Sequence, residues 1–138
     1  MAAILLTLVQ IYRTLRAAGP AGSISEWLFL RLPFSLYTGW ITVASIANIS
    51  CVQIAMGWDN AGLSAIDWTL LKLAIAGAVG ATVVLRLRDI PYVLVIAWAA
   101  YGIASRQVGT PEVAGAAVTL SVLAMLLAVA EVFRKGRL

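Results

Sequence analysis

Few side chains in this sequence could carry out covalent or metal chemistry. The 138 residues contain no histidine and a single cysteine, Cys51. Histidine is the commonest ligand of haem and transition metals, and clusters of cysteines hold zinc and iron–sulfur centres. A Ser–His–acid triad needs histidine, and no glycine-rich phosphate loop is present. We therefore expect no catalytic residue, no metal site and no enzymatic activity.

Aromatic residues give the sharpest functional signal. Tyr37 and Trp40 are three positions apart, as are Trp98 and Tyr101, so each pair lies one turn apart on a helix. At about 1.5 Å per residue from the expected helix starts, Trp40 and Trp98 both lie about 10–12 Å deep. The four residues form either a packed aromatic core or the wall of a pocket for a flat lipophilic ligand.

The remaining polar residues favour a role in helix packing over a role in ligand binding. Thr42, Ser45 and Asn48 follow each other at three-residue spacing and form a polar stripe, which holds helices together or contacts a ligand. Lys72 can extend toward the membrane surface to reach Asp67 or Asp59, as a structural anchor, or it belongs to an ion or substrate site. Glu131, close to the basic C-terminus, is expected to be paired or hydrated.

The elements that position these residues follow from composition. Hydrophobic residues make up 62% of the chain, charged residues 12%, and the mean hydropathy is +0.97, which excludes a soluble globular domain. Apolar runs occur at residues 2–15, 33–56, 67–85, 90–105 and 112–133. Because about 20 residues cross a bilayer, the sequence predicts an all-α, polytopic transmembrane bundle of five segments in one domain, 1–138, with the first segment short.

Two segments allow a second interpretation. The run 2–15 is interrupted by Arg13 and could instead be a signal peptide, although a basic leading region is missing. Ser23 and Glu26 have capping-box spacing before residues 24–32, and Pro33 follows. Residues 24–32 are therefore either a short interfacial helix or the start of one long kinked helix.

Cap residues and small residues support these helices. Ser64 and Asp67 have capping-box spacing, and Asp89 precedes a first-turn proline at Pro91. Small residues recur at four-residue spacing within 74–81 and 117–128, so helix backbones can approach closely there.

The basic residues predict an orientation. With the N-terminus outside, five crossings place eight of the ten on the inner side, and an odd number of crossings is required for this separation. The inner set is Arg13, Arg16, Arg31, Arg86, Arg88, Arg134, Lys135 and Arg137; the outer set is Lys72 and Arg106. The net charge of +4 thus reflects orientation and the lipid bilayer, not nucleic acid.

Several motifs resemble a known family. Trp40, Ala44 and Asn48 form W-x-x-x-A-x-x-x-N, as in the last helix of the TspO/MBR tryptophan-rich sensory proteins. The order of motifs is similar to the C-terminal half of longer bacterial relatives and covers about residues 3 to 133. These motifs are the segment 33–44 (P-F-S-L-Y-T-G-W-I-T-V-A), Gly57–Asp59, Arg86–Tyr92 and Trp98–Ile103.

The resemblance implies a bacterial inner-membrane protein that binds a tetrapyrrole-like ligand or a lipid without histidine ligation, with Tyr37, Trp40 and Asn48 as pocket residues. Together with Trp98 and Tyr101, they form the candidate ligand-binding site. A second hypothesis is an accessory subunit of a larger photosynthetic or respiratory membrane complex, or a homo-oligomer. An ion-coupled transporter is disfavoured, because paired broken helices and buried charges are missing.

Overall fold

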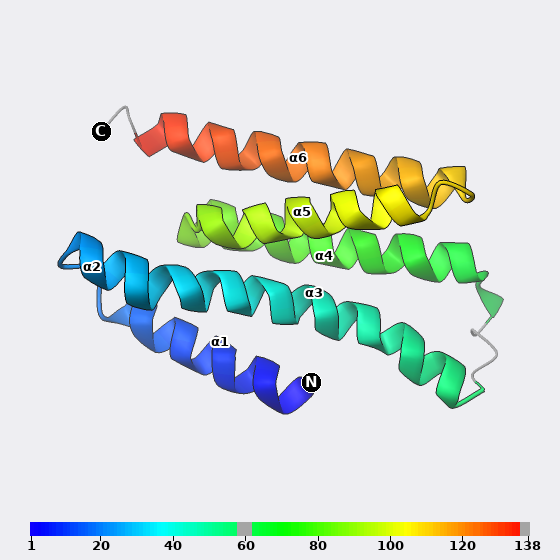
Figure 1. Ribbon diagram of the computed structural model, residues 1–138, viewed down its shortest axis with the longest axis horizontal. Helices are drawn as coiled ribbons and strands as arrows, with labels where there is room; N and C mark the ends of the chain where they lie inside the picture. Colours follow the sequence, from blue (N-terminus) through cyan, green and yellow to red (C-terminus); the bar gives the residue numbers. More distant parts are fainter. Residues whose placement is uncertain (58–61, 136–138) are drawn as a thin grey trace.

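The computed structural model describes residues 1–57 and 62–135, and all its regular elements are helical. The helices lie side by side in antiparallel order (Figure 1), which confirms the all-α class. They are α1 (Ala2–Ala17), α2 (Ile24–Glu26), the π-helical turn η1 (Trp27–Arg31), α3 (Leu32–Ala55), α4 (Ala65–Leu87), α5 (Ile90–Arg106) and α6 (Pro111–Lys135).

Three helical runs are long and apolar enough to cross a membrane: Ile24–Ala55, Ala65–Leu87 and Pro111–Arg134. In each, only 22–28% of the most apolar window is buried inside the bundle, so most of the apolar surface faces outward. Such a surface requires lipid around it. α5 is apolar but has 17 residues and α1 has 16, so their crossings stay predictions.

Residues 24–55 form one continuous helical run, the second of the two predicted alternatives. Pro33 has no N–H, and its ring crowds the preceding turn of an α-helix. The widened turn η1 relieves this crowding, because the Leu32 N–H bonds to the Trp27 carbonyl, one residue further back than in an α-helix. The proline therefore changes the local helix type without ending the helix.

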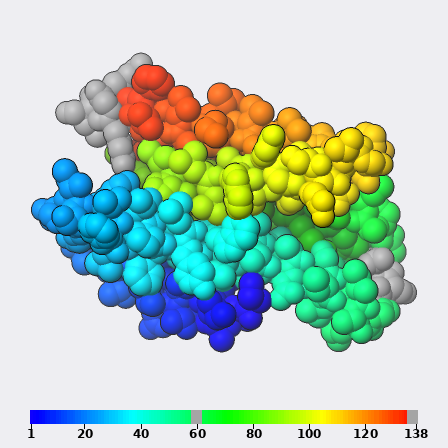
Figure 2. All heavy atoms as spheres, viewed as in Figure 1, coloured from blue at the N-terminus to red at the C-terminus, as the bar shows by residue number. Residues whose placement is uncertain are grey.

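The antiparallel order gathers basic residues at one end of the bundle, which we call the basic end. It contains the C-terminal ends of α1, α4 and α6, with η1 and the α4–α5 link, and carries Arg13, Arg16, Arg31, Arg86, Arg88 and Arg134. The opposite end, which we call the far end, has the α3–α4 and α5–α6 connections. Figures 1 and 2 show α1 covering α3 only along the half nearer the basic end.

Small residues form much of the helix-packing core, as their spacing predicts. Ala76, Ala117, Ala124 and Ala128 are buried. A Cβ on Gly77 would lie 2.9 Å from the Leu120 side chain, so α4 and α6 approach closely there.

Candidate ligand-binding site

Asp89 is the centre of a buried polar cluster at the basic end. It lies in the two-residue link between α4 and α5 and is 4% exposed. Arg88, directly before it, has left-handed backbone angles (φ 54°, ψ 36°) that end α4. The Asp89 carboxylate accepts a hydrogen bond from the Tyr92 N–H at 3.1 Å, so it caps α5 as predicted.

Two other helices donate hydrogen bonds to the same carboxylate. Its Oδ2 accepts from the Tyr12 hydroxyl and from the Arg16 guanidinium, both at 2.6 Å. Its Oδ1 accepts from the Ser35 hydroxyl at 2.6 Å. Tyr12 and Arg16 are four residues apart on α1, so both face one point. Asp89 therefore ties α1 and α3 to the α4–α5 link.

These bonds also fix the charge of Asp89. Burial on its own would raise the pKa of the carboxyl group. The hydrogen bond from Ser35, together with those from Tyr12, the Tyr92 N–H and Arg16, outweighs burial and lowers the pKa below its ordinary value of 3.8. Asp89 is thus an ionised carboxylate, and each of its two oxygens accepts two hydrogen bonds.

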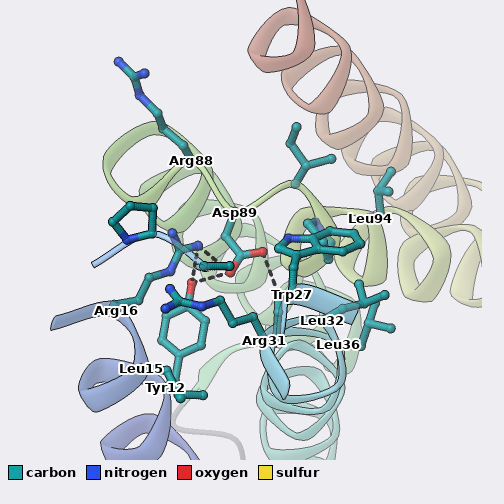
Figure 3. A pocket seen from close by; sticks show the side chains of 15 residues that line it. Tyr12, Leu15, Arg16, Trp27, Arg31, Leu32, Leu36, Arg88, Asp89 and Leu94 are labelled. Carbon is teal, nitrogen blue, oxygen red and sulfur yellow. Dashed lines mark hydrogen bonds and ion pairs between the residues drawn. The ribbon is translucent and has the colours of Figure 1, made fainter. Parts of the chain in front are cut away.

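A cavity of about 550 Å³ adjoins the Asp89 cluster (Figure 3). In the figure, Tyr12, Leu15 and Arg16 lie on one side of the cluster, while Trp27 and Leu94 lie on the other. The walls are mostly apolar, and the polar groups are three arginines, two hydroxyls and Asp89. The lining residues are Tyr12, Leu15, Arg16, Pro20, Ala21, Trp27, Arg31, Leu32, Ser35, Leu36, Arg88, Asp89, Ile90, Pro91 and Leu94.

The η1 turn and the preceding loop form one wall of this cavity. Arg31 Nε and Nη2 donate to one Glu26 carboxylate oxygen at 2.9 and 2.8 Å, and Nη1 donates to the Gly19 carbonyl. The second Glu26 oxygen accepts from the Gly22 N–H at 2.8 Å. Because Arg31 joins the loop after α1 to the helix, it fixes the wall that carries Trp27.

A second ion-pair cluster connects the cavity to α6. Glu131 is buried and pairs with Arg88 at 3.4 Å and with Arg134 at 3.5 Å, which confirms the expected pairing. Arg88 also lines the cavity, although its side chain points away from Asp89 in Figure 3.

The predicted aromatic site lies elsewhere, between α3 and α5. The Trp40 and Trp98 rings are in contact, with centroids 5.2 Å apart, so the predicted common layer is confirmed. Both are exposed on the bundle surface, as are Tyr37 and Tyr101, and Trp98 is 64% exposed. Tyr37 lines a shallow cavity of about 310 Å³ beside α1. Neither this cavity nor the larger one is lined by Trp40, Trp98 or Tyr101.

In the polar stripe of α3, Thr42 bonds to another helix. The Tyr92 hydroxyl donates to Thr42 at 2.9 Å, in addition to the bond between Ser35 and Asp89. Asn48 is half-buried and lines neither cavity. Ser45 Oγ is buried without a hydrogen-bond partner in the described part of the chain.

Lys72 has different partners from those predicted. Its ammonium donates to Ser50 Oγ at 2.6 Å and to Gln53 Oε1 at 2.7 Å, both on α3. Asp67 instead completes the predicted capping box with Ser64. The other candidate partner, Asp59, lies outside the described residues.

A scan against protein families matches residues 1–130 to the TSPO-like protein family. The chain belongs to this family. Searches of curated proteins and of solved structures returned no match. Family membership and the three long apolar helices together make this TSPO-like chain an integral membrane protein.

Sequence reasoning identified Asp89 only as a helix cap and did not predict the cavity. A signal was present, because Tyr12 and Arg16 share one face of a short apolar helix and Asp89 is an acidic residue in the arginine-rich link between two apolar runs. Their meeting depends on how α1 packs against α3, which spacing along the sequence does not give.

Proposed function

We propose that this TSPO-like protein binds a flat lipophilic ligand of tetrapyrrole type at the basic end and does not transform it chemically. The observation that carries the proposal is the cavity of about 550 Å³ with apolar walls and a few convergent polar groups. Ligand sites typically enclose about 300–1,000 Å³ with this kind of lining. Trp27 offers a ring for stacking on a flat ligand.

The charge of the lining favours a ligand with acidic groups. Arg16, Arg31 and Arg88 line the cavity, against the single carboxylate of Asp89. Each arginine already has an acidic partner, but a guanidinium carries five N–H donors, and Arg16 uses only Nη2 in its bonds to Tyr12 and Asp89. Carboxylates on the rim of a tetrapyrrole could accept hydrogen bonds from the remaining N–H groups.

The same groups support binding without catalysis. Asp89 accepts four hydrogen bonds, from two hydroxyls, one N–H and Arg16, so it is poorly placed to remove a proton from a ligand. The chain has no histidine to serve as axial ligand to a metal in the ring. A bound pigment would therefore be metal-free or ligated by water, a backbone carbonyl or an amide side chain.

Tryptophan fluorescence quenching by protoporphyrin tests this proposal and locates the site. We expect saturable quenching that is largely lost in Trp27→Phe and retained in Trp98→Phe, since Trp27 lines the cavity and Trp98 does not. The opposite pattern would favour the Trp40–Trp98 surface predicted from the sequence. The dimethyl ester of the porphyrin should bind more weakly than the free acid. Absence of saturable quenching by either compound would reject the proposed function.

An accessory role in a larger photosynthetic or respiratory membrane complex is the alternative. The exposed aromatic surface of Tyr37, Trp40, Trp98 and Tyr101 supports it, because aromatic side chains are enriched where proteins meet. Native mass measurement of the particle extracted in mild detergent separates the two roles. A stable assembly far above 14.6 kDa plus detergent favours the subunit role, whereas a monomer with a bound small molecule favours ligand binding.

We also propose five crossings of the bacterial inner membrane, with the N-terminus outside and the C-terminus inside. The clustering of basic residues at one end of the antiparallel bundle supports this orientation. In a Cys51→Ser background, an impermeant thiol reagent should label Leu63→Cys and Gln107→Cys from outside, but not Ala18→Cys. Outside labelling of Ala18→Cys would reject the orientation.

A further inference from the structure

A second polar cluster lies at the far end of the bundle, away from the cavity. Lys72 on α4 donates to Ser50 and Gln53 on α3 at 2.6 and 2.7 Å, and its Nζ lies 5.9 Å from the centre of the Trp68 ring. These partners are two neutral oxygens and an aromatic face, so none of them neutralises the ammonium. Among the described residues, these bonds occupy two of its three N–H donors, so one remains for an acceptor from outside the cluster.

Gln53 presents an unused donor at the same place. Gln53 is 6% exposed, and its Nε2 has no hydrogen-bond partner among the described residues. The bond from Lys72 to Oε1 fixes the amide orientation, because exchanging the two amide atoms would place a donor against the ammonium. A buried N–H pair without an acceptor is unfavourable, so the cluster is complete only when an acceptor is supplied.

The surface around this cluster is apolar. Ile54, next to Gln53, is 82% exposed, and Leu71 and Ile75 on α4 are also exposed. Lys72 is the eighth residue of α4, which places it about 10 Å from the helix start at 1.5 Å per residue. A lysine at this depth can extend its ammonium toward the headgroup region while acyl chains cover the apolar side chains.

We propose that Lys72 and Gln53 bind the phosphate group of a phospholipid in the leaflet at the far end. A phosphate oxygen accepts from the remaining ammonium N–H. Gln53 Nε2 is buried, so it donates to the same phosphate after the amide turns outward on lipid binding, which provides both missing interactions. The exposed isoleucines and leucine favour a lipid over free phosphate, because its acyl chains cover them. This site is independent of the cavity at the basic end.

Native mass spectrometry of the full chain in detergent tests the proposal. The probes are phosphatidylglycerol, diacylglycerol with the same acyl chains, and inorganic phosphate. We expect the protein to retain phosphatidylglycerol about tenfold better than diacylglycerol, as expected for charge-assisted hydrogen bonds. Inorganic phosphate at millimolar concentration should not displace the lipid.

Gln53→Glu is the decisive variant. The new carboxylate would pair with the Lys72 ammonium and repel phosphate, so lipid retention should fall about tenfold without a loss of thermal stability. Lys72→Met should also lose the lipid, and Gln53→Glu keeps the test valid if that variant fails to fold. Arg106→Met removes an exposed cation from the same end and should retain lipid normally.

Three results would overturn the proposal. Equal retention of diacylglycerol would show that the acyl chains alone bind, and displacement by inorganic phosphate would show a free-anion site. Equal lipid loss in Arg106→Met and Gln53→Glu would show a general effect of charge at this end.

Discussion

Replacing Asp89 with asparagine should destabilise the bundle by releasing α1 and α3 from the α4–α5 link. Asparagine keeps one acceptor, so it can retain the bonds from Ser35 and from the Tyr92 N–H as neutral hydrogen bonds. Its NH₂ group would face the Tyr12 hydroxyl and the Arg16 guanidinium. Tyr12 can turn its hydroxyl proton away and accept a hydrogen bond from this NH₂ group. Arg16 can only donate, so it loses its bond to residue 89.

The magnitude follows from the change in bond type. A hydrogen bond to a charged group contributes about 1.5–3 kcal/mol and a neutral one about 0.5–1.5 kcal/mol, so each retained bond weakens by about 1 kcal/mol. The Arg16 side chain is 37% exposed, and water can replace much of its interaction with Asp89. The two weakened bonds, from Ser35 and the Tyr92 N–H, and the exchange of the Tyr12 bond to a charged acceptor for a neutral one give a total loss of about 3 kcal/mol.

Unfolding by sodium dodecyl sulfate, followed by circular dichroism in mixed micelles, measures this loss. Asp67→Asn is the matched control, because it makes the same chemical change at the exposed capping box of α4. We expect the Asp89 variant to unfold at clearly lower detergent fraction and the control to remain close to the unmodified protein. Equal midpoints for the two variants would refute the view that the Asp89 cluster holds the helices together.

The pH dependence of stability should have the same origin. The pKa of Asp89 is lower in the folded protein than its ordinary value of 3.8, so its contribution is complete above that value and is lost as pH falls through the folded pKa. Detergent unfolding curves should show this loss below about pH 4, and Asp89→Asn should reduce it. Gly39→Ala should cost about 1–3 kcal/mol, since its Cβ would lie 3.3 Å from the Tyr92 carbonyl oxygen on α5. Gly102→Ala meets no atom within 4 Å and should gain up to about 1 kcal/mol; similar unfolding midpoints for the two alanine variants would contradict the close helix contact at Gly39.

Local signals in the sequence predicted the helices well. The capping box at Ser64 and the Asp89 cap each depend on residues three positions apart, and both form as expected. The contact between Trp40 and Trp98 was also predictable, because a helix has a constant rise and the bilayer aligns helix starts. In each case the relative position of the two residues is set by one helix or by the membrane.

The hydrogen-bond partners on different helices were harder to predict, because they depend on how each helix is rotated about its own axis. The sequence places Lys72 near acidic residues, yet it turns toward α3 and bonds to Ser50 and Gln53. For a helix surrounded by lipid, the apolar pattern specifies rotation weakly: α3 exposes apolar residues while burying Ser35 and Thr42. Hydrogen bonds therefore decide which face turns inward. A buried acid such as Asp89, whose donors come from three helices, can be identified only after those rotations are known.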